Sequence, residues 1–368
     1  MRTVRRMIQR DILGAVLFAT VAFLALFSFI DLVDELRWVN AADPQGYQVR
    51  HALAFVATLS VSTLYELIPI TVLIGSVFVM ARLAQNSEFT VLRTSGLGPW
   101  RALRVMLGLG LVFTLITFAI GDFLAPAANR AGQFLRANYL REITVGQTGA
   151  WLREKQAYRS FVVNVGVLQT DGTMRRVRVI EFDRSGRIVS TSDAKTGKFG
   201  ADDAWTLAGV SRTEFVADAN SSAMGTRQSL PEYRWPTTLT SEMVSVALLR
   251  PERMSTIDLF QFMRHLDANG QSSQRYEIEF WRKVFYPLSC LVMVVLALPF
   301  GYLHFRTRGI STFVFIGVMT GISFFLLNNL FGHFGNLRNW WPWLTAAAPG
   351  LIYSLLSLTA FGWLVVRR

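Results

Sequence analysis

The sequence predicts an α-helical polytopic membrane protein of six transmembrane helices with an all-β domain inserted in its middle. Two observations predict this class. Apolar residues make up 52% of the 368 residues, and they gather in long runs instead of spreading evenly. A polar block of about residues 126–280, with short alternating segments, separates the third run from the fourth. A soluble chain of this composition would have to expose much of its apolar surface to water.

Six apolar runs have the length that a helix needs to cross a bilayer. A helix of ~20 residues rises ~1.5 Å per residue and spans ~30 Å of hydrocarbon. Three runs precede the polar block and three follow it: Ile12–Ile30, about Ser62–Ala81, Val105–Ala125, Val284–Tyr302, Ile310–Phe331 and Leu344–Val366. The first run follows four arginines, as a signal peptide would. It is too long for a signal core and no small-x-small cleavage site follows, so we expect it to remain as the first span.

The net charge of +12 could indicate nucleic-acid binding or membrane topology. Its distribution favours topology. With six spans, both termini share one side with loops 82–104 and 303–309, and these pieces hold twelve arginines against two carboxylates. The opposite short loops hold Arg37, Arg50 and Arg338. The positive-inside rule then predicts cytoplasmic termini and an exported block 126–280, and we expect no nucleic-acid partner.

The polar block reads as an antiparallel β domain. Segments 159–167, 175–182, 186–194 and 204–215 are rich in Val, Ile, Phe and Thr, and turn residues separate them. This spacing is typical of a sandwich or barrel of about 100 residues. The expected organisation is 1–125 for helices one to three, 126–254 for the β domain with its connectors, and 255–368 for a linking helix and helices four to six. Ser255 or Thr256 can cap that linking helix, and Gly270 ends it.

No motif indicates catalysis. The chain has no G-x-x-x-x-G-K-[ST] loop, so we do not expect it to hydrolyse ATP itself. Its four histidines are scattered without metal-ligand spacing, and its one cysteine, Cys290, lies inside the fourth run. We therefore expect no catalytic residue, cofactor or metal in this chain, and a small packing role for Cys290.

The stretch NSEFTVLRTSG, residues 86–96, is a short charged segment between two apolar spans. Asn86 or Ser87 can start a helix there and Gly96 can end it. Two interpretations remain open. The helix could lie on the membrane surface with Phe89 and Leu92 buried, or it could be a coupling helix that presents Glu88, Phe89, Leu92 and Arg93 to a separate ATPase.

This stretch, with IPITVLIG before it, resembles the signature of the LptF/LptG permease family of lipopolysaccharide export, and is closest to the LptG branch. FWRKVFYPLSCLVMVVLALPF, residues 280–300, resembles the start of the family's fourth span. The order of three spans, exported β domain and three spans is also similar, so the resemblance covers nearly the whole chain.

The resemblance implies a bacterial inner-membrane permease subunit of an ABC transporter, paired with an LptF-type permease and a single-span LptC-type protein. An LptB-type ATPase dimer would bind ATP and Mg and contact Glu88. The β domain would be a periplasmic jellyroll. Lipopolysaccharide would be extracted from the outer leaflet of the inner membrane and passed to a periplasmic bridge towards the outer membrane, through gates formed by spans one and five. Gly317 and Gly321 give the fifth span a close-packing face.

Basic groups at the rim of the resulting cavity would hold the lipid A phosphates. Relatives can carry lysine near the end of the first span, where this chain has Asp31. Only Arg37 remains basic in this segment, so the role rests on Arg37 or moves to Arg136. Divalent cations that bridge Asp31 or Asp34 to phosphate are a further alternative.

Two other classes of protein compete with this interpretation. Lipoprotein-release and macrolide-exporter permeases also couple to an ATPase, but they place the exported domain after the first of four spans. A membrane-anchored sensor or scaffold would need neither a coupling helix nor a cavity. It predicts that Glu88 can be replaced without loss of activity.

Overall fold

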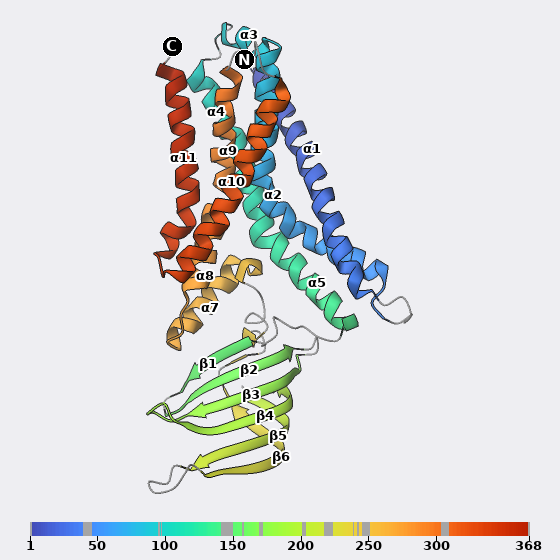
Figure 1. Ribbon diagram of the computed structural model, residues 1–368, viewed down its shortest axis with the longest axis vertical. Coiled ribbons are helices and arrows are strands. Elements are labelled where there is room, and N and C mark those ends of the chain that lie inside the picture. Colours follow the sequence, from blue (N-terminus) through green and yellow to red (C-terminus); the bar gives the residue numbers. More distant parts are fainter. Residues whose placement is uncertain are drawn as a thin grey trace. The chain divides into compact units, whose positions relative to one another are not determined.

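The computed structural model describes residues 2–39, 46–94, 96, 98–140, 150–156, 158–168, 172–200, 204–216, 224–237, 239–240, 243–244, 251–302 and 309–366 (Figure 1). The chain divides into two compact units. The first, called the membrane unit, comprises Met1–Arg37, Val56–Asn129 and Glu277–Arg368. The second, called the sheet unit, comprises Trp38–Phe55 and Arg130–Tyr276.

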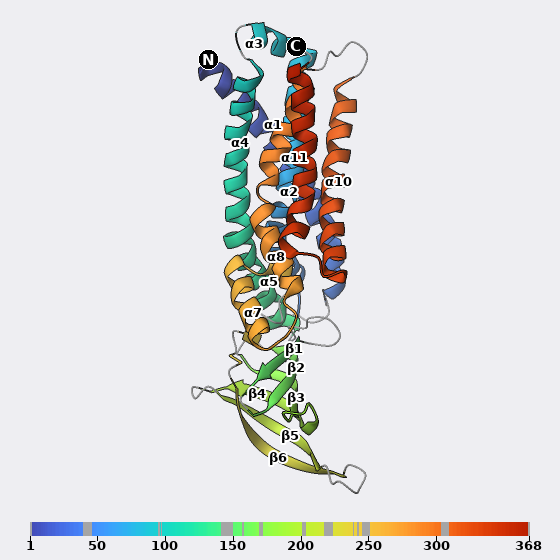
Figure 2. The same cartoon turned by 90° about the vertical axis from the view of Figure 1, so that its left-hand side faces the viewer.

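Helices form most of the chain outside the sheet. Figures 1 and 2 show α1, α2, α4, α10 and α11 of the membrane unit running alongside one another. The α-helices are α1 (Arg2–Glu35), α2 (Val49–Gln85), α3 (Glu88–Thr94), α4 (Pro99–Ala119), α5 (Ala125–Leu140), α7 (Thr256–Ala268), α8 (Gln274–Phe285), α9 (Ser289–Ala297), α10 (Ile310–Leu337) and α11 (Pro342–Val366). Short helical turns are η1 (Leu36–Trp38), η2 (Ile120–Leu124), η3 (Pro251–Arg253) and η4 (Leu298–Tyr302).

The polytopic helical class is confirmed. Among the described residues, five helical stretches are long and apolar enough to cross a membrane, and a sixth span results if the bent pair α8 and α9–η4 counts as one. The five are Arg5–Trp38, Val49–Gln85, Pro99–Arg136, Ile310–Leu337 and Pro342–Trp363. The fourth predicted span is therefore a broken one, which the hydropathy of the sequence does not reveal.

Pro287 explains the break in the fourth span. The two helical parts meet at an angle of 46°. Proline has no N–H to donate and disfavours helical backbone at the residue before it. The chain passes through a tight turn in which Leu288 N donates to Phe285 O at 3.1 Å. Ser289 Oγ donates to Tyr286 O at 2.5 Å, so the turn keeps its carbonyl satisfied inside an apolar environment.

The core of the membrane unit surrounds α9, most of whose side chains are buried. Cys290 is 0% exposed, and its Sγ lies 3.3 Å from Thr117 Oγ1. The expected packing role of this thiol is confirmed. A buried apolar side chain contributes roughly 1.5–3 kcal/mol in water; between membrane helices the gain comes instead from close packing and interhelical hydrogen bonds.

The all-β character of the inserted domain is also confirmed. The described strands form one antiparallel sheet in the order β1-β2-β3-β4-β5-β6. Every neighbouring pair is thus consecutive in sequence, which makes the sheet a meander where we expected a sandwich or barrel. The strands are β1 (Ala150–Lys155), β2 (Ser160–Leu168), β3 (Met174–Phe182), β4 (Ile188–Phe199), β5 (Ala204–Val216) and β6 (Met224–Pro236).

Helix α7 packs its apolar side chains into the hydrophobic core of the sheet unit. Phe262 and Leu266 join Trp205 and Trp235 in one buried cluster. Ser255 is the N-cap of this helix: its side chain accepts from Asp258 N, and Asp258 reciprocates in a capping box. The predicted start of the helix is therefore confirmed.

Glu181 is a buried carboxylate on β3. Its side chain is 3% exposed and pairs with Arg159 and with Arg212, the latter at 3.3 Å. Ser190 Oγ on β4 donates to Glu181 Oε2, the oxygen that Arg212 also contacts, at 2.7 Å. By contrast, Arg178 and Asp193 form an ion pair at 2.5 Å with side chains that are 56% and 51% exposed. The two pairs offer a matched comparison of buried and exposed charge on one sheet.

We expect Glu181→Ala to destabilise the β domain by roughly 2 kcal/mol, because it leaves the buried Ser190 hydroxyl without its acceptor and removes a buried partner of Arg212, which keeps its pair with Glu214. Asp193→Ala is the control and should cost at most about 0.5–1 kcal/mol, because exposed pairs are screened. Pulse proteolysis of the full chain in increasing urea measures both. Equal shifts in the two variants would show that the Glu181 network carries no more stability than a surface pair.

Candidate functional site

The segment 86–96 holds helix α3, which is anchored into the membrane unit by Phe89. This side chain is 1% exposed and its ring meets Tyr302 edge-on, with centroids 4.8 Å apart. Gly301 allows the approach: a Cβ placed on it would lie 3.3 Å from both Met80 Sδ and the Phe89 ring. Phe89 therefore fixes α3 to the end of the fourth span and does not present its ring at the surface.

The outer face of α3 is formed by Glu88 and Val91. Glu88 is exposed, with Asn86 Nδ2 donating to its Oε1 at 3.2 Å. Val91 is 64% exposed and adds an apolar side chain to this face of the helix. Leu92 is partly buried against the core, and the Arg93 side chain lies outside the described residues. Our sequence analysis missed Val91; its place three residues after Glu88 on a helix was the available signal.

Arg37 lies at the end of the first span. Its Nη2 is 3.3 Å from Asp34 Oδ1, and the two side chains are 77% and 65% exposed. A pair this exposed contributes little to stability, so a stronger anion can replace the carboxylate at small cost.

Arg136 on α5 occupies a different environment, within the sheet unit. Its guanidinium carbon lies 5.1 Å from the ring centroid of Trp38 and 5.2 Å from that of Phe55. Two aromatic faces hold the cation without removing its charge, and each cation–π contact contributes about 0.5–1 kcal/mol at such a site.

Gly317 and Gly321 on α10 are buried and face α2. A Cβ on Gly317 would lie 3.5 Å from Val77, which is an ordinary contact. A Cβ on Gly321 would lie 2.7 Å from Ile70 Cγ2, closer than packed carbon atoms approach. The two helices are therefore in closest contact at Gly321.

A set of polar contacts at the break of the fourth span escaped our sequence analysis. Lys283 is 8% exposed, and its Nζ donates to Gly121 O at 2.8 Å. Gly121 lies in η2, a π-helical turn whose wider winding opens the backbone ladder. Three residues further along the chain, Tyr286 Oη donates to Glu66 O at 2.6 Å, one turn before Pro69.

The neighbouring Arg282 is paired as well. Its Nη1 lies 2.7 Å from Glu279 Oε1, and its Nη2 donates to Asn329 Oδ1 of α10 at 3.2 Å. Adjacent basic residues at the start of an apolar run, followed by a proline, were the sequence signal for this cluster. Its groups satisfy one another and the backbone, which is the arrangement that charge inside a membrane protein requires.

No metal centre emerges from these contacts. Within the described ranges, no group of three or more His, Cys, Asp or Glu side chains is placed to hold an ion. The notable features are instead an anchored surface helix, two basic groups and a close helix–helix contact. With the long apolar helices and the inserted sheet, they define a multi-pass membrane protein.

The chain belongs to the LptF/LptG family. It matches the family described as "Lipopolysaccharide export system permease LptF/LptG" over residues 6–363. It is similar to the "Lipopolysaccharide export system permease protein LptG" of Haemophilus influenzae, with 25% identity over 369 residues that cover 100% of this chain and 99% of the relative. The protein of the same name from Escherichia coli strain K12 is 26% identical over 362 residues, 97% of each chain. The resemblance seen in the motifs is confirmed.

We expect Gly321→Ala to lower the melting temperature of the purified protein. Overpacking against Ile70 costs about 1–3 kcal/mol, which exceeds the gain of about 1 kcal/mol in helix propensity. Gly317→Ala has room and should leave the melting temperature unchanged or slightly higher. Thermal unfolding in detergent compares the two, and a drop of the same size in both would contradict the close contact at Gly321.

Proposed function

We propose that this chain is one of two permease subunits of an ATP-driven ABC transporter that extracts lipopolysaccharide from the outer leaflet of the inner membrane. It passes the lipid to a periplasmic bridge towards the outer membrane. Family membership over nearly the whole chain supports the lipopolysaccharide substrate. The observation that carries the coupling part is α3, a short helix that is fixed to the membrane unit by Phe89 and exposes Glu88 and Val91.

An LptB-type ATPase dimer docks on this face of α3 in our proposal. The exposed Val91 fills an apolar groove of the ATPase, and Glu88 pairs with a basic group at its rim. ATP and Mg²⁺ belong to that partner, and this chain holds no cofactor. Leu92 and Arg93, which we also predicted to take part, belong to the same coupling helix in this proposal. Because Phe89 is buried against Tyr302, its role is to transmit a displacement of α3 to the fourth span.

Two further partners belong to this proposal. An LptF-type permease forms a heterodimer with this chain around one lipid cavity, and an LptC-type single-span protein joins it. The arginine distribution supports cytoplasmic termini and a periplasmic sheet in the bacterial inner membrane. α10, with Gly317 and Gly321, contributes to the gate, because glycines allow a helix to slide closely along its neighbour.

The substrate headgroup is held by Arg136 in this proposal, and Arg37 is the alternative. Trp38 and Phe55 keep the Arg136 guanidinium in place before the lipid arrives, which lowers the ordering cost of binding a phosphate. The pair of guanidinium and phosphate is a strong, charge-assisted one. ATP-driven closure then moves the lipid only if the closed state binds it more weakly than the open state.

We expect Glu88→Lys to reduce the amount of ATPase that co-purifies with this chain at least tenfold. The reversed charge faces the basic rim of the partner, and like charges across an interface cost several kcal/mol. Gln85→Lys is the control, because it also introduces a lysine, at an exposed position outside α3, without removing a carboxylate. Quantitative mass spectrometry after mild-detergent purification gives the ratio of the two chains.

Two results would contradict the coupling proposal. The first is undiminished ATPase recovery with Glu88→Lys. The second is wild-type chain that purifies without any P-loop ATPase and with a periplasmic signalling protein, which would favour the sensor class.

We expect Arg136→Gln to lower the lipopolysaccharide that co-purifies with the complex about tenfold, since a hydrogen bond to a charged group contributes about 1.5–3 kcal/mol. Arg264→Gln removes an exposed arginine from α7 and serves as the control. The measurement is the lipid A phosphate recovered per mole of protein. Retention of wild-type amounts by Arg136→Gln would move the headgroup role to Arg37 or to bridging cations.

A further inference from the structure

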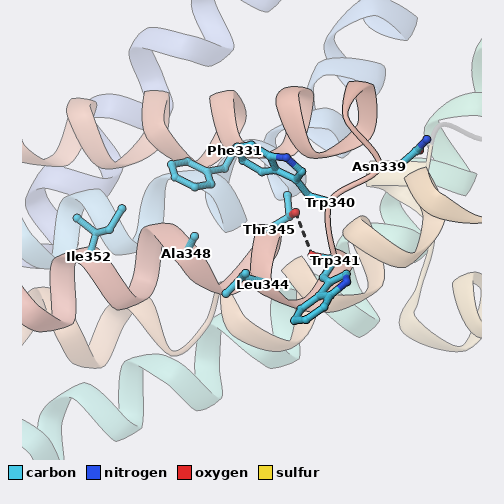
Figure 3. A pocket seen from close by; sticks show the side chains of 8 residues that line it. All are labelled: Phe331, Asn339, Trp340, Trp341, Leu344, Thr345, Ala348 and Ile352. Atoms are coloured by element: carbon cyan, nitrogen blue, oxygen red, sulfur yellow. Dashed lines mark hydrogen bonds between the residues drawn. The ribbon is translucent and has the colours of Figure 1, made fainter.

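A crevice lies between α10 and α11 near the turn that joins them (Figure 3). Its volume is about 650 Å³, within the range of ~300–1,000 Å³ that is typical of small-molecule sites. The walls are almost entirely apolar and come from Phe331, Trp340, Trp341, Leu344, Ala348 and Ile352. Figure 3 shows Leu344, Ala348 and Ile352 following one another along α11, which extends the crevice ~12 Å along the helix axis.

The crevice exists because the two helices are tied together on either side of it. At one end, α10 and α11 touch so closely that a Cβ on Gly335 would lie 2.2 Å from Thr345 Cγ2. At the other end, Ser323 Oγ and Tyr353 Oη are 2.5 Å apart. Between these ties the small side chain of Ala348 leaves the space open.

The wall formed by Trp340 is fixed by the backbone. Asn339 has a φ of +50°, in the left-handed region, and Trp340 N donates to Gly335 O at 3.0 Å. This is a Schellman end to α10. It turns the indole back over the helix, where its ring centroid lies 6.2 Å from that of Phe331. The site is therefore built before any ligand binds.

The charge on α10, α11 and the turn between them is of one sign. Between Ile310 and Val366 the sequence holds no Asp or Glu, and its one arginine or lysine is Arg338. That residue is exposed, immediately precedes Asn339 of the crevice lining, and has no recorded ion pair within the described residues. The tryptophans of this turn mark a membrane–water interface. A cation at headgroup level above an apolar crevice complements an anionic amphiphile.

We propose that this crevice binds one acyl chain of an anionic glycerophospholipid of the bilayer, with the lipid phosphate on Arg338. Both helices are long and apolar enough to cross a membrane, so bilayer lipid has access to their exposed faces. The guanidinium–phosphate pair provides headgroup selection, and the acyl chain covers Trp341 and Leu344, which are exposed in the isolated chain. This site is separate from Arg136 and does not depend on the proposed transport function.

Native mass spectrometry of the purified protein measures the lipid that it retains and the polypeptides that accompany it. Phosphatidylglycerol and phosphatidylcholine with identical acyl chains are the two probes. Ala348→Leu fills the crevice. Gly350→Leu introduces the same side chain on α11 where nothing lies within 4 Å of the new Cβ, so it is the control. Arg338→Gln removes the cation from an exposed position, where the fold does not depend on it.

We expect wild type and Gly350→Leu to retain one phosphatidylglycerol that Ala348→Leu loses. Arg338→Gln should weaken phosphatidylglycerol binding about fivefold, the effect of one arginine near an anionic lipid surface, and leave phosphatidylcholine unchanged. Three outcomes would overturn the proposal: equal phosphatidylglycerol retention in Ala348→Leu, loss of lipopolysaccharide instead of phosphatidylglycerol in that variant, or a photo-crosslinker at Ile352 that captures a polypeptide and no lipid.

Discussion

The membrane unit depends on one constraint: a backbone carbonyl that leaves the helical ladder inside hydrocarbon must find another donor. Three irregularities create such carbonyls, namely Pro69 in α2, the π-helical turn η2 and the break at Pro287. Lys283 satisfies the carbonyl of the π-helical turn, because its Nζ donates to Gly121 O. Tyr286 donates to Glu66 O of α2, next to the Tyr65 carbonyl that loses its backbone donor at Pro69. The break in the fourth span brings the Lys283 and Tyr286 side chains to these carbonyls. Side chains of the fourth span therefore stabilise the irregular backbone of the second and third spans.

In the coupling mechanism that we propose, this arrangement gives the fourth span a central place. Its polar end reaches α2, η2 and α10 through side-chain hydrogen bonds. Its other end, η4, packs on α3 through Tyr302 and Gly301. A displacement of α3 is therefore applied to a helix whose far end is bonded to three others. Discrete hydrogen bonds favour two alternative arrangements over gradual deformation, which is what alternating affinity for a lipid needs.

Much of the fold could be predicted from the sequence because its signals are local. Apolar runs, the Ser255 cap and the turns between strands each act over a few residues. The missed elements are the edge strands: β1 is half charged, and β6 contains Pro231 and a run of polar residues. An edge strand pairs with one neighbouring strand only and tolerates charged residues and proline, so its alternation of apolar and polar residues is weak. Hairpin turns also determine which strands pair, but they do not show whether the sheet closes into a barrel or packs as a sandwich.

The candidate site was predictable in position and less so in detail. Helix α3 lies within the expected stretch, but periodicity cannot tell which apolar face turns inward. Phe89 is buried because Gly301, more than 200 residues away in sequence, leaves room for its ring. The contacts of Lys283 and Tyr286 likewise depend on helix irregularities that neither residue encodes. Such long-range fits are properties of the packed structure and have no local sequence pattern.

The burial of Cys290 makes the natural chain suitable for site-directed labelling. Its thiol is 0% exposed and held beside Thr117, and the sequence has no second cysteine. Maleimide and nitroxide reagents therefore have no accessible target until one is introduced. A single exposed position such as Val91 can be labelled without first deleting a native residue, so movements of α3 can be followed in an otherwise unmodified core.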